Sequence, residues 1–240
     1  AIIDSVFRAH EMAKKSAEEA HRDAVRVQSN EERIVLGPYS SHSLCTDAKH
    51  LCFVFSRYKF CAKLLEGKQK VLEIGCGDAL GLPIVAQSVG RVYATDWDAR
   101  IIEENKQRAA FIGNCTFSHF NITESPFSET LDAVYLLDVI EHVDPSKETR
   151  LMEHIAKSLS HTGICLVGTP NKEAARFASP QSEAGHINLK THRELRTLMG
   201  QHFSNVFLFS MNDEVVHTGF SPMAHYLIAM GVGRRVGLGE

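Results

Sequence analysis

Residues 71–77 read Val-Leu-Glu-Ile-Gly-Cys-Gly, and Asp96 follows nineteen residues after Gly77. The apolar start of this stretch is typical of a buried β-strand that runs into a turn. Gly75 and Gly77 allow the backbone to turn sharply and to approach a ligand closely. A helix beginning near Asp78 would point free N–H groups at an anionic part of that ligand. Because an acid such as Asp96 at the end of the next strand suits the two hydroxyls of a ribose, the stretch predicts a nucleoside cofactor site.

The spacing of the glycines separates two classes of nucleoside cofactor. A dinucleotide fingerprint has the pattern Gly-x-Gly-x-x-Gly, whereas the run from Gly75 to Gly81 is one residue longer. An NAD-dependent oxidoreductase is therefore disfavoured. With Glu73 two residues before the first glycine, the segment resembles the first motif, acid-x-Gly-x-Gly, of the class I S-adenosylmethionine (SAM) dependent methyltransferases. The resemblance extends over about residues 65–210, because later motifs follow in the expected order.

This resemblance implies an α/β, Rossmann-like fold whose mostly parallel seven-stranded sheet ends in an antiparallel strand, preceded by N-terminal helices. The hydrophobic pattern of the chain independently predicts strands that alternate with helices, as in a parallel sheet with right-handed crossovers. Strands are expected at 70–75, 91–96, 115–120, 132–138, 162–168, 204–210 and 224–230. Helices are expected at 47–65, 79–89, 98–111, 146–159 and 191–200.

Residues 1–65 are expected to form a helical appendage or lid, and residues 66–240 the SAM-binding methyltransferase domain. Small and apolar residues recur at steps of three and four over residues 2–27, which predicts an amphipathic helix that packs or forms a homodimer. Residues 30–46 are expected to be irregular. Candidate lid residues are Tyr39, His42, His50, Arg57 and Tyr58.

The resemblance also assigns residues to the cofactor. Trp97 would lie against the adenine, or Asp98 would cap the next helix. At the end of the third strand the family usually has an acid, and this chain has Asn121, whose amide can still bond adenine because it both donates and accepts. An ordinary loop asparagine is the alternative. The expected cofactor-binding residues are Glu73, Gly75, Cys76, Gly77, Asp96, Trp97, Asn121, Ile122 and Asp138.

Asp138, Glu141 and His142 follow the fourth predicted strand, where ligands bind in this class of fold. The string resembles the fourth motif of the ubiquinone-biosynthesis O-methyltransferases, which implies a divalent-metal site at Asp138, Glu141, His142 and Asn171. This donor set suits Mg²⁺ or Mn²⁺. The alternative is metal-free catalysis, with His142 as general base and Glu141 orienting the acceptor.

A later histidine, His186, precedes a predicted helix. In related small-molecule methyltransferases a Gly-His at this place lines the acceptor pocket, so the expected catalytic residues are His142, Glu141 and His186. A structural loop histidine is the alternative. Small-RNA 2′-O-methyltransferases also resemble this chain here, since they combine a Glu-x-x-Glu-His set with a later histidine.

The 240-residue chain is 44% hydrophobic with a formal net charge of −3, which disfavours a nucleic-acid partner. It has no membrane-length apolar run, and its six cysteines form no Cys-x-x-Cys pair, so we expect a cytoplasmic protein without a membrane partner. We expect SAM-dependent methyl transfer to an oxygen of a small hydroxylated acceptor, such as a sugar or phenol. The alternatives are an RNA 2′-O-methyltransferase and a non-catalytic SAM-binding partner protein.

Overall fold

The computed structural model describes residues 16–19, 22, 34–177 and 185–235. The chain divides into two compact units, residues 1–35 and 36–240. In the first unit, residues 16–19 and 22 are helical and exposed and residues 34–35 are irregular and exposed, while most of the amphipathic helix expected at 2–27 lies outside the described residues. None of the described helices is long and apolar enough to cross a membrane.

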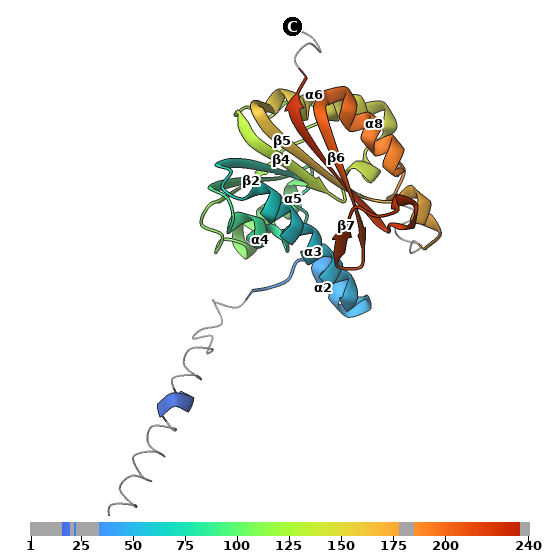
Figure 1. Ribbon diagram of the computed structural model, residues 1–240. Helices are drawn as coiled ribbons and strands as arrows, with labels where there is room; N and C mark the ends of the chain where they lie inside the picture. Colours follow the sequence, from blue (N-terminus) through green and yellow to red (C-terminus); the bar gives the residue numbers. More distant parts are fainter. Residues whose placement is uncertain (1–15, 20–21, 23–33, 178–184, 236–240) are drawn as a thin grey trace, which may run out of the picture. The chain divides into compact units, whose positions relative to one another are not determined.

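The second unit is built on an eight-stranded sheet with strand order β3-β2-β1-β4-β5-β8-β6-β7 (Figure 1). The strands are β1 (Lys70–Ile74), β2 (Arg91–Asp96), β3 (Cys115–His119), β4 (Leu131–Leu137), β5 (Leu159–Pro170), β6 (Phe203–Asn212), β7 (Val215–His217) and β8 (Tyr226–Arg234). The first five strands pair in parallel, whereas β8, β6 and β7 pair antiparallel. The predicted fold class is confirmed, and the short edge strand β7 is an addition to the seven strands expected.

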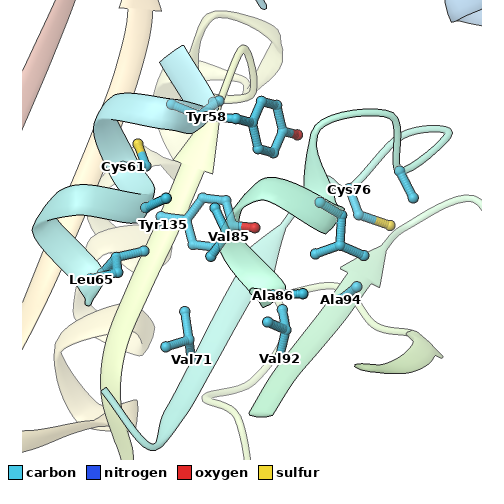
Figure 2. Close-up of a cluster of buried hydrophobic side chains, with 14 of the residues drawn as sticks. Tyr58, Cys61, Leu65, Val71, Cys76, Val85, Ala86, Val92, Ala94 and Tyr135 are labelled. Carbon is cyan, nitrogen blue, oxygen red and sulfur yellow. The ribbon is translucent and has the colours of Figure 1, made fainter. Parts of the chain in front are cut away.

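Helices cover both faces of this sheet. They are α2 (Pro38–Thr46), α3 (Ala48–Leu65), α4 (Leu82–Ala86), α5 (Ala99–Arg108), α6 (Pro145–Ser158) and α8 (His192–His202), with the 3-10 helices η2 (Ile140–His142), η3 (Lys172–Phe177) and η4 (Ser221–Met223). Alternate side chains of each strand point to opposite faces. Val71 therefore packs in the cluster under α3, α4 and α5, which Figure 2 shows. Its neighbour Leu72 packs on the other face, under α6 and α8.

Two helix predictions were wrong. The helix after the glycine turn begins at Leu82 and not near Asp78, because Gly77 and Ala79 have left-handed φ angles of 50° and 60° that a helix cannot continue through. Residues 38–46, which the sequence analysis expected to be irregular, form α2. Pro38 occupies the first turn of α2, where its fixed φ and missing N–H cost nothing.

Candidate active site

A cavity of about 650 Å³ opens at the carboxyl ends of β1, β2 and β4. Its walls come from α2, α3, the turn after β1, the residues that follow β2, and residues 137–143. Of the predicted lid residues, Tyr39, His50 and Tyr58 line it. The cavity therefore lies where ligands bind in open α/β sheets, outside the carboxyl ends of the strands.

The turn after β1 is held tightly against its neighbours. Gly75 has a φ of 73° and Gly77 a φ of 50°, values that glycine adopts at little cost. The N–H groups of Gly75 and Cys76 both donate to the carbonyl oxygen of Thr95, at 2.8 and 2.9 Å. A Cβ on Gly75 would lie 2.4 Å from Cγ2 of Val139. Both the backbone angle and the close packing thus require glycine at position 75.

Asp96 links this turn to the end of β2. Its Oδ2 accepts a hydrogen bond from the N–H of Gly77 at 3.0 Å, and its Oδ1 accepts one from the N–H of Asp98 at 2.9 Å. Asp98 itself caps α5 by accepting from the N–H of Arg100. Because each carboxylate oxygen can accept a second hydrogen bond, Asp96 still has acceptor positions for a ribose diol. Trp97 also lines the cavity and is 74% exposed.

Glu73 lies beneath the cavity and not in its wall. The side chain is buried, and its Oε1 accepts a hydrogen bond from the hydroxyl of Tyr58 at 2.7 Å. Burial raises the pKa of the Glu73 carboxyl to about 7, and the hydrogen bond from Tyr58 offsets only part of this effect. Glu73 therefore ties α3 to β1 under the glycine turn, in place of the direct cofactor contact that was expected.

Asn121 and Ile122 also lie outside the wall of the cavity. Oδ1 of Asn121 accepts hydrogen bonds from the N–H and hydroxyl of Thr123, and its Nδ2 donates to Glu124. This is a local turn of the kind that asparagine side chains commonly stabilise. Ile122 is buried in the apolar cluster beneath α6. The local turn explains Asn121 better than the predicted adenine contact does.

Glu141, His142 and His186 form a compact group, called here the Glu–His–His group. Carboxylate and ring-nitrogen atoms of the three residues lie within 4.8 Å of one another, and the two imidazole centroids are 5.0 Å apart. Glu141 is fully buried, with Oε2 accepting from the hydroxyl of Thr169 at 3.1 Å and Oε1 left without a partner among the residues that the structure describes. Burial and the nearby charge of Asp138 raise the pKa of the Glu141 carboxyl.

The orientation of His142 follows from its hydrogen bond to the chain after β5. Its Nδ1 lies 2.9 Å from the carbonyl oxygen of Gly185. Because a carbonyl oxygen can only accept, Nδ1 carries the proton, and Nε2 is left with a free lone pair. That lone pair can take a proton from an acceptor or bind a cation. His142 is also in the wall of the cavity.

Asn188 fixes the segment that carries Gly185 and His186. Its N–H donates to the carbonyl oxygen of Glu141 at 3.0 Å, and its Nδ2 donates to Oε2 of Glu148 at 2.7 Å. The Nζ of Lys190 lies 2.5 Å from the same Glu148 oxygen. Asn188 is buried, so these bonds act away from competing water. Asn188 could not be predicted from the sequence, because nothing in its spacing shows that it contacts η2.

Two residues of the predicted metal set lie elsewhere. Oδ2 of Asp138 accepts a hydrogen bond from Nη1 of the buried Arg57 at 2.8 Å. Nδ2 of Asn171 donates to the carbonyl oxygens of Ser221 and Ala224, and its Oδ1 accepts from the next turn of chain. The predicted role of Asn171 is therefore corrected, because its amide is used to hold η4. The residue that lies beside Glu141 and His142 is His186.

Comparison with known proteins agrees with this geometry. A model of the methyltransferase domain family matches residues 47–203. The chain belongs to this family. A probable S-adenosylmethionine-dependent methyltransferase of Mycobacterium tuberculosis is 29% identical over 103 residues, which are 42% of this chain and 36% of that protein. A relative from Mycolicibacterium smegmatis matches at the same identity over 38% of its length. The chain thus spans little more than a third of the curated relatives that it matches.

Solved structures show the same fold at low identity. The N-methyltransferase NodS from Bradyrhizobium japonicum superposes with a TM-score of 0.59 at 14% identity, covering 79% of this chain and 99% of that one. The methyltransferase domain of bacterial CtHen1 gives 0.63 at 16%, over 75% and 99%. A putative O-methyltransferase from Nostoc punctiforme gives 0.58 at 20%, over 75% and 56%. The chain thus has the class I methyltransferase fold that its first motif predicts, and this fold is shared by N- and O-methyltransferases.

Proposed function

We propose that this methyltransferase transfers the methyl group of SAM to an oxygen of a small hydroxylated acceptor, such as a sugar or a phenol. The observation that carries the proposal is the Glu–His–His group beside the cofactor cavity. A neutral amine already has a lone pair for attack, whereas a hydroxyl becomes a good nucleophile only as it loses its proton. A free imidazole lone pair beside the cavity meets that requirement.

In this proposal the residues of the chain work mainly by positioning. The glycine turn and Asp96 hold the cofactor, and the acceptor oxygen lies in line with the transferred methyl group. Nε2 of His142 takes the acceptor proton, since Gly185 fixes Nδ1 as the protonated nitrogen. Glu141, whose buried carboxyl lies within 4.8 Å of the imidazole nitrogens, orients the acceptor.

The Glu–His–His group also fits a divalent metal. One carboxylate and two imidazoles match the ligand preferences of Mn²⁺ more closely than those of Mg²⁺, because imidazole suits the softer ion. The buried Oε1 of Glu141, which has no hydrogen-bond partner in the described part of the chain, is a donor atom of the kind that such an ion binds. A bound ion would polarise the acceptor oxygen and lower its pKa. We therefore propose Glu141, His142 and His186 as the ligands, without Asn171. This is the alternative to His142 acting as the base, because the single lone pair on Nε2 serves either the ion or the acceptor proton.

An RNA 2′-O-methyltransferase is the second candidate. The observation in its favour is that His186 joins Glu141 and His142, as the later histidine does in the small-RNA enzymes that the sequence resembles. A ribose 2′-hydroxyl is also an oxygen that must lose a proton. The net charge of −3 argues against it, because binding to phosphates relies on clustered lysine and arginine.

A screen with methyl-labelled SAM tests these proposals together. Pools of phenols, sugars, amines and short RNAs are incubated with the protein, with EDTA or with added Mn²⁺ or Mg²⁺. Labelled phenols or sugars are the expected result. Labelling of amines alone would contradict the oxygen acceptor, and labelling of RNA alone would favour the second candidate. Turnover that is indifferent to EDTA would remove the metal and leave His142 as the base.

Single variants assign the roles. We expect His142→Ala to lose most turnover while binding the demethylated cofactor S-adenosylhomocysteine (SAH) normally in calorimetry, and His186→Ala to lose Mn²⁺ binding in the absence of any acceptor. His161→Ala is the matched control, because His161 is exposed and lies at the opposite end of the sheet, near the start of β5. Full activity of His142→Ala would exclude His142 from the mechanism.

A further inference from the structure

Helix α2 lies before the segment that matches the methyltransferase family, which begins at residue 47. It nevertheless supplies part of the wall of the cofactor cavity, through Tyr39, Ser40 and Ser43. We infer that α2 belongs to the SAM site, and that two hydrogen bonds between Ser40 and Asp78 hold it closed over the cofactor and slow the release of the cofactor.

The contact between α2 and the glycine turn is short and specific. The N–H of Ser40 donates to Oδ2 of Asp78 at 2.7 Å, and its hydroxyl donates to Oδ1 at 2.8 Å. Gly37, the residue that precedes α2, has no side chain to cap the helix. The Asp78 carboxylate thus accepts from the N–H of Ser40, a group in the first turn that a nearby side chain normally caps. Its negative charge also interacts favourably with the positive N-terminal end of the helix dipole.

Gly37 allows the two segments to approach this closely. A Cβ on Gly37 would lie 2.2 Å from the Cβ of Asp78, so any larger residue would push α2 away from the turn. Asp78 directly follows Gly77 and itself lines the cavity. The Ser40–Asp78 contacts therefore join α2 to the same turn that approaches the cofactor.

Tyr39 places an aromatic ring on this wall. Cδ2 of Tyr39 lies 3.9 Å from the position that a Cβ on Gly77 would occupy, so the ring borders the glycine turn. Tyr39 is 63% exposed, and Trp97, on another wall of the same cavity, is 74% exposed. Large exposed aromatic side chains that border one cavity offer apolar surface to a ligand with flat, partly apolar groups, such as a nucleoside.

The chain provides its own reporter for the test. Trp97 is the single tryptophan of the sequence and lies in the cavity wall, so its fluorescence can follow SAH binding and release in stopped flow. Calorimetry gives the affinity independently. Neither measurement requires an acceptor or turnover, so their outcome is independent of the proposed oxygen acceptor.

Ser40→Ala removes one hydrogen bond to a carboxylate, and we expect SAH to dissociate about tenfold faster, the scale of one such bond. Ser41→Ala is the matched control, because the hydroxyl of Ser41 contacts only the carbonyl oxygen of Leu36, at 3.4 Å. Tyr39→Ala should weaken SAH binding, whereas Tyr39→Phe keeps the ring and should not.

Thermal unfolding shows whether each variant is folded, and Asp78→Asn is a second way to weaken the same contacts. In the Asp78→Asn background the further change Ser40→Ala should have a smaller effect than it has alone, because the two residues act together. Equal dissociation rates for Ser40→Ala, Ser41→Ala and the unchanged protein would overturn the inference. So would independent, additive effects of the Ser40 and Asp78 variants.

Discussion

The buried carboxyl of Glu73 makes the stability of this protein depend on pH in a specific way. Its pKa is raised from 4.5 to about 7 because burial disfavours the carboxylate. The folded chain therefore keeps this proton at pH values where the unfolded chain has lost it. Consequently the Glu73 contribution to stability is fully present below the unfolded pKa, falls as the pH rises, and is lost above the folded pKa.

The magnitude follows from the same values. A difference of one in pKa corresponds to about 1.4 kcal/mol, so the full loss is about 3 to 4 kcal/mol. Most of it, about 2 to 3 kcal/mol, falls between about pH 5 and about pH 8. Glu73→Gln removes the titration and keeps an oxygen that can accept from Tyr58. Relative to this variant, the unchanged protein should lose about 2 to 3 kcal/mol of unfolding free energy over that range.

Urea unfolding of both proteins, without ligand, at the two pH values measures this difference. Other titrating groups are common to both proteins, so they cancel in the comparison. Glu103→Gln is the control, because its side chain is 70% exposed, and its difference from the unchanged protein should barely depend on pH. If the difference between Glu73→Gln and the unchanged protein is the same at both pH values, Glu73 is charged in the fold and the reasoning fails.

Three further outcomes are expected. Asp96→Ala should weaken SAM and SAH binding in calorimetry by more than tenfold, because the lost carboxylate also anchors two backbone N–H groups of the cofactor turn. Gly75→Ala should lower the unfolding free energy by about 2 kcal/mol or more, since Gly75 has a positive φ and its new Cβ would lie 2.4 Å from a neighbouring side chain. Gly113→Ala is the control and should be nearly neutral in thermal unfolding, because a Cβ there has no described atom within 4 Å. Asn188→Ala should lower kcat and leave SAH affinity unchanged, because it frees the segment around Gly185 that orients His142. Equal losses in kcat and SAH affinity would contradict this role.

The sheet and the cofactor turn could be predicted because their signals are local. The alternation of Val71 and Leu72 reflects the two faces of one strand, and Gly75 reflects a single backbone angle. Helix α2 gave no such signal, since its cap is a carboxylate 38 residues away. A pattern that depends on the packing of distant segments cannot be recognised from neighbouring residues alone.

The acceptor side shows the same limit. The position of Glu141 and His142 after the fourth strand was predicted, since the carboxyl ends of parallel strands meet at one edge. Asn171 also follows a strand of that edge, yet its amide is turned toward η4. His186 is held near the group because the N–H of Asn188, two residues later, donates to the carbonyl oxygen of Glu141 in η2. The spacing of these two segments along the chain has no periodic pattern from which the contact could be recognised.

The place of β8 in the sheet has a consequence for the order in which the protein is assembled during synthesis. β8 lies between β5 and β6, although it follows both in the chain. Until residues 226–234 have left the ribosome, the only strand that can pair with β6 is β7. Arg57 likewise lacks the ring of Tyr226, whose centroid lies 3.8 Å from its guanidinium carbon in the folded protein. Strands β1 to β4, which bear the cofactor turn, need no later segment to pair. The strands that bear the cofactor turn can thus pair on a nascent chain, whereas the stacking of Tyr226 on Arg57, which holds Asp138 at the cavity, forms only when the last strand inserts.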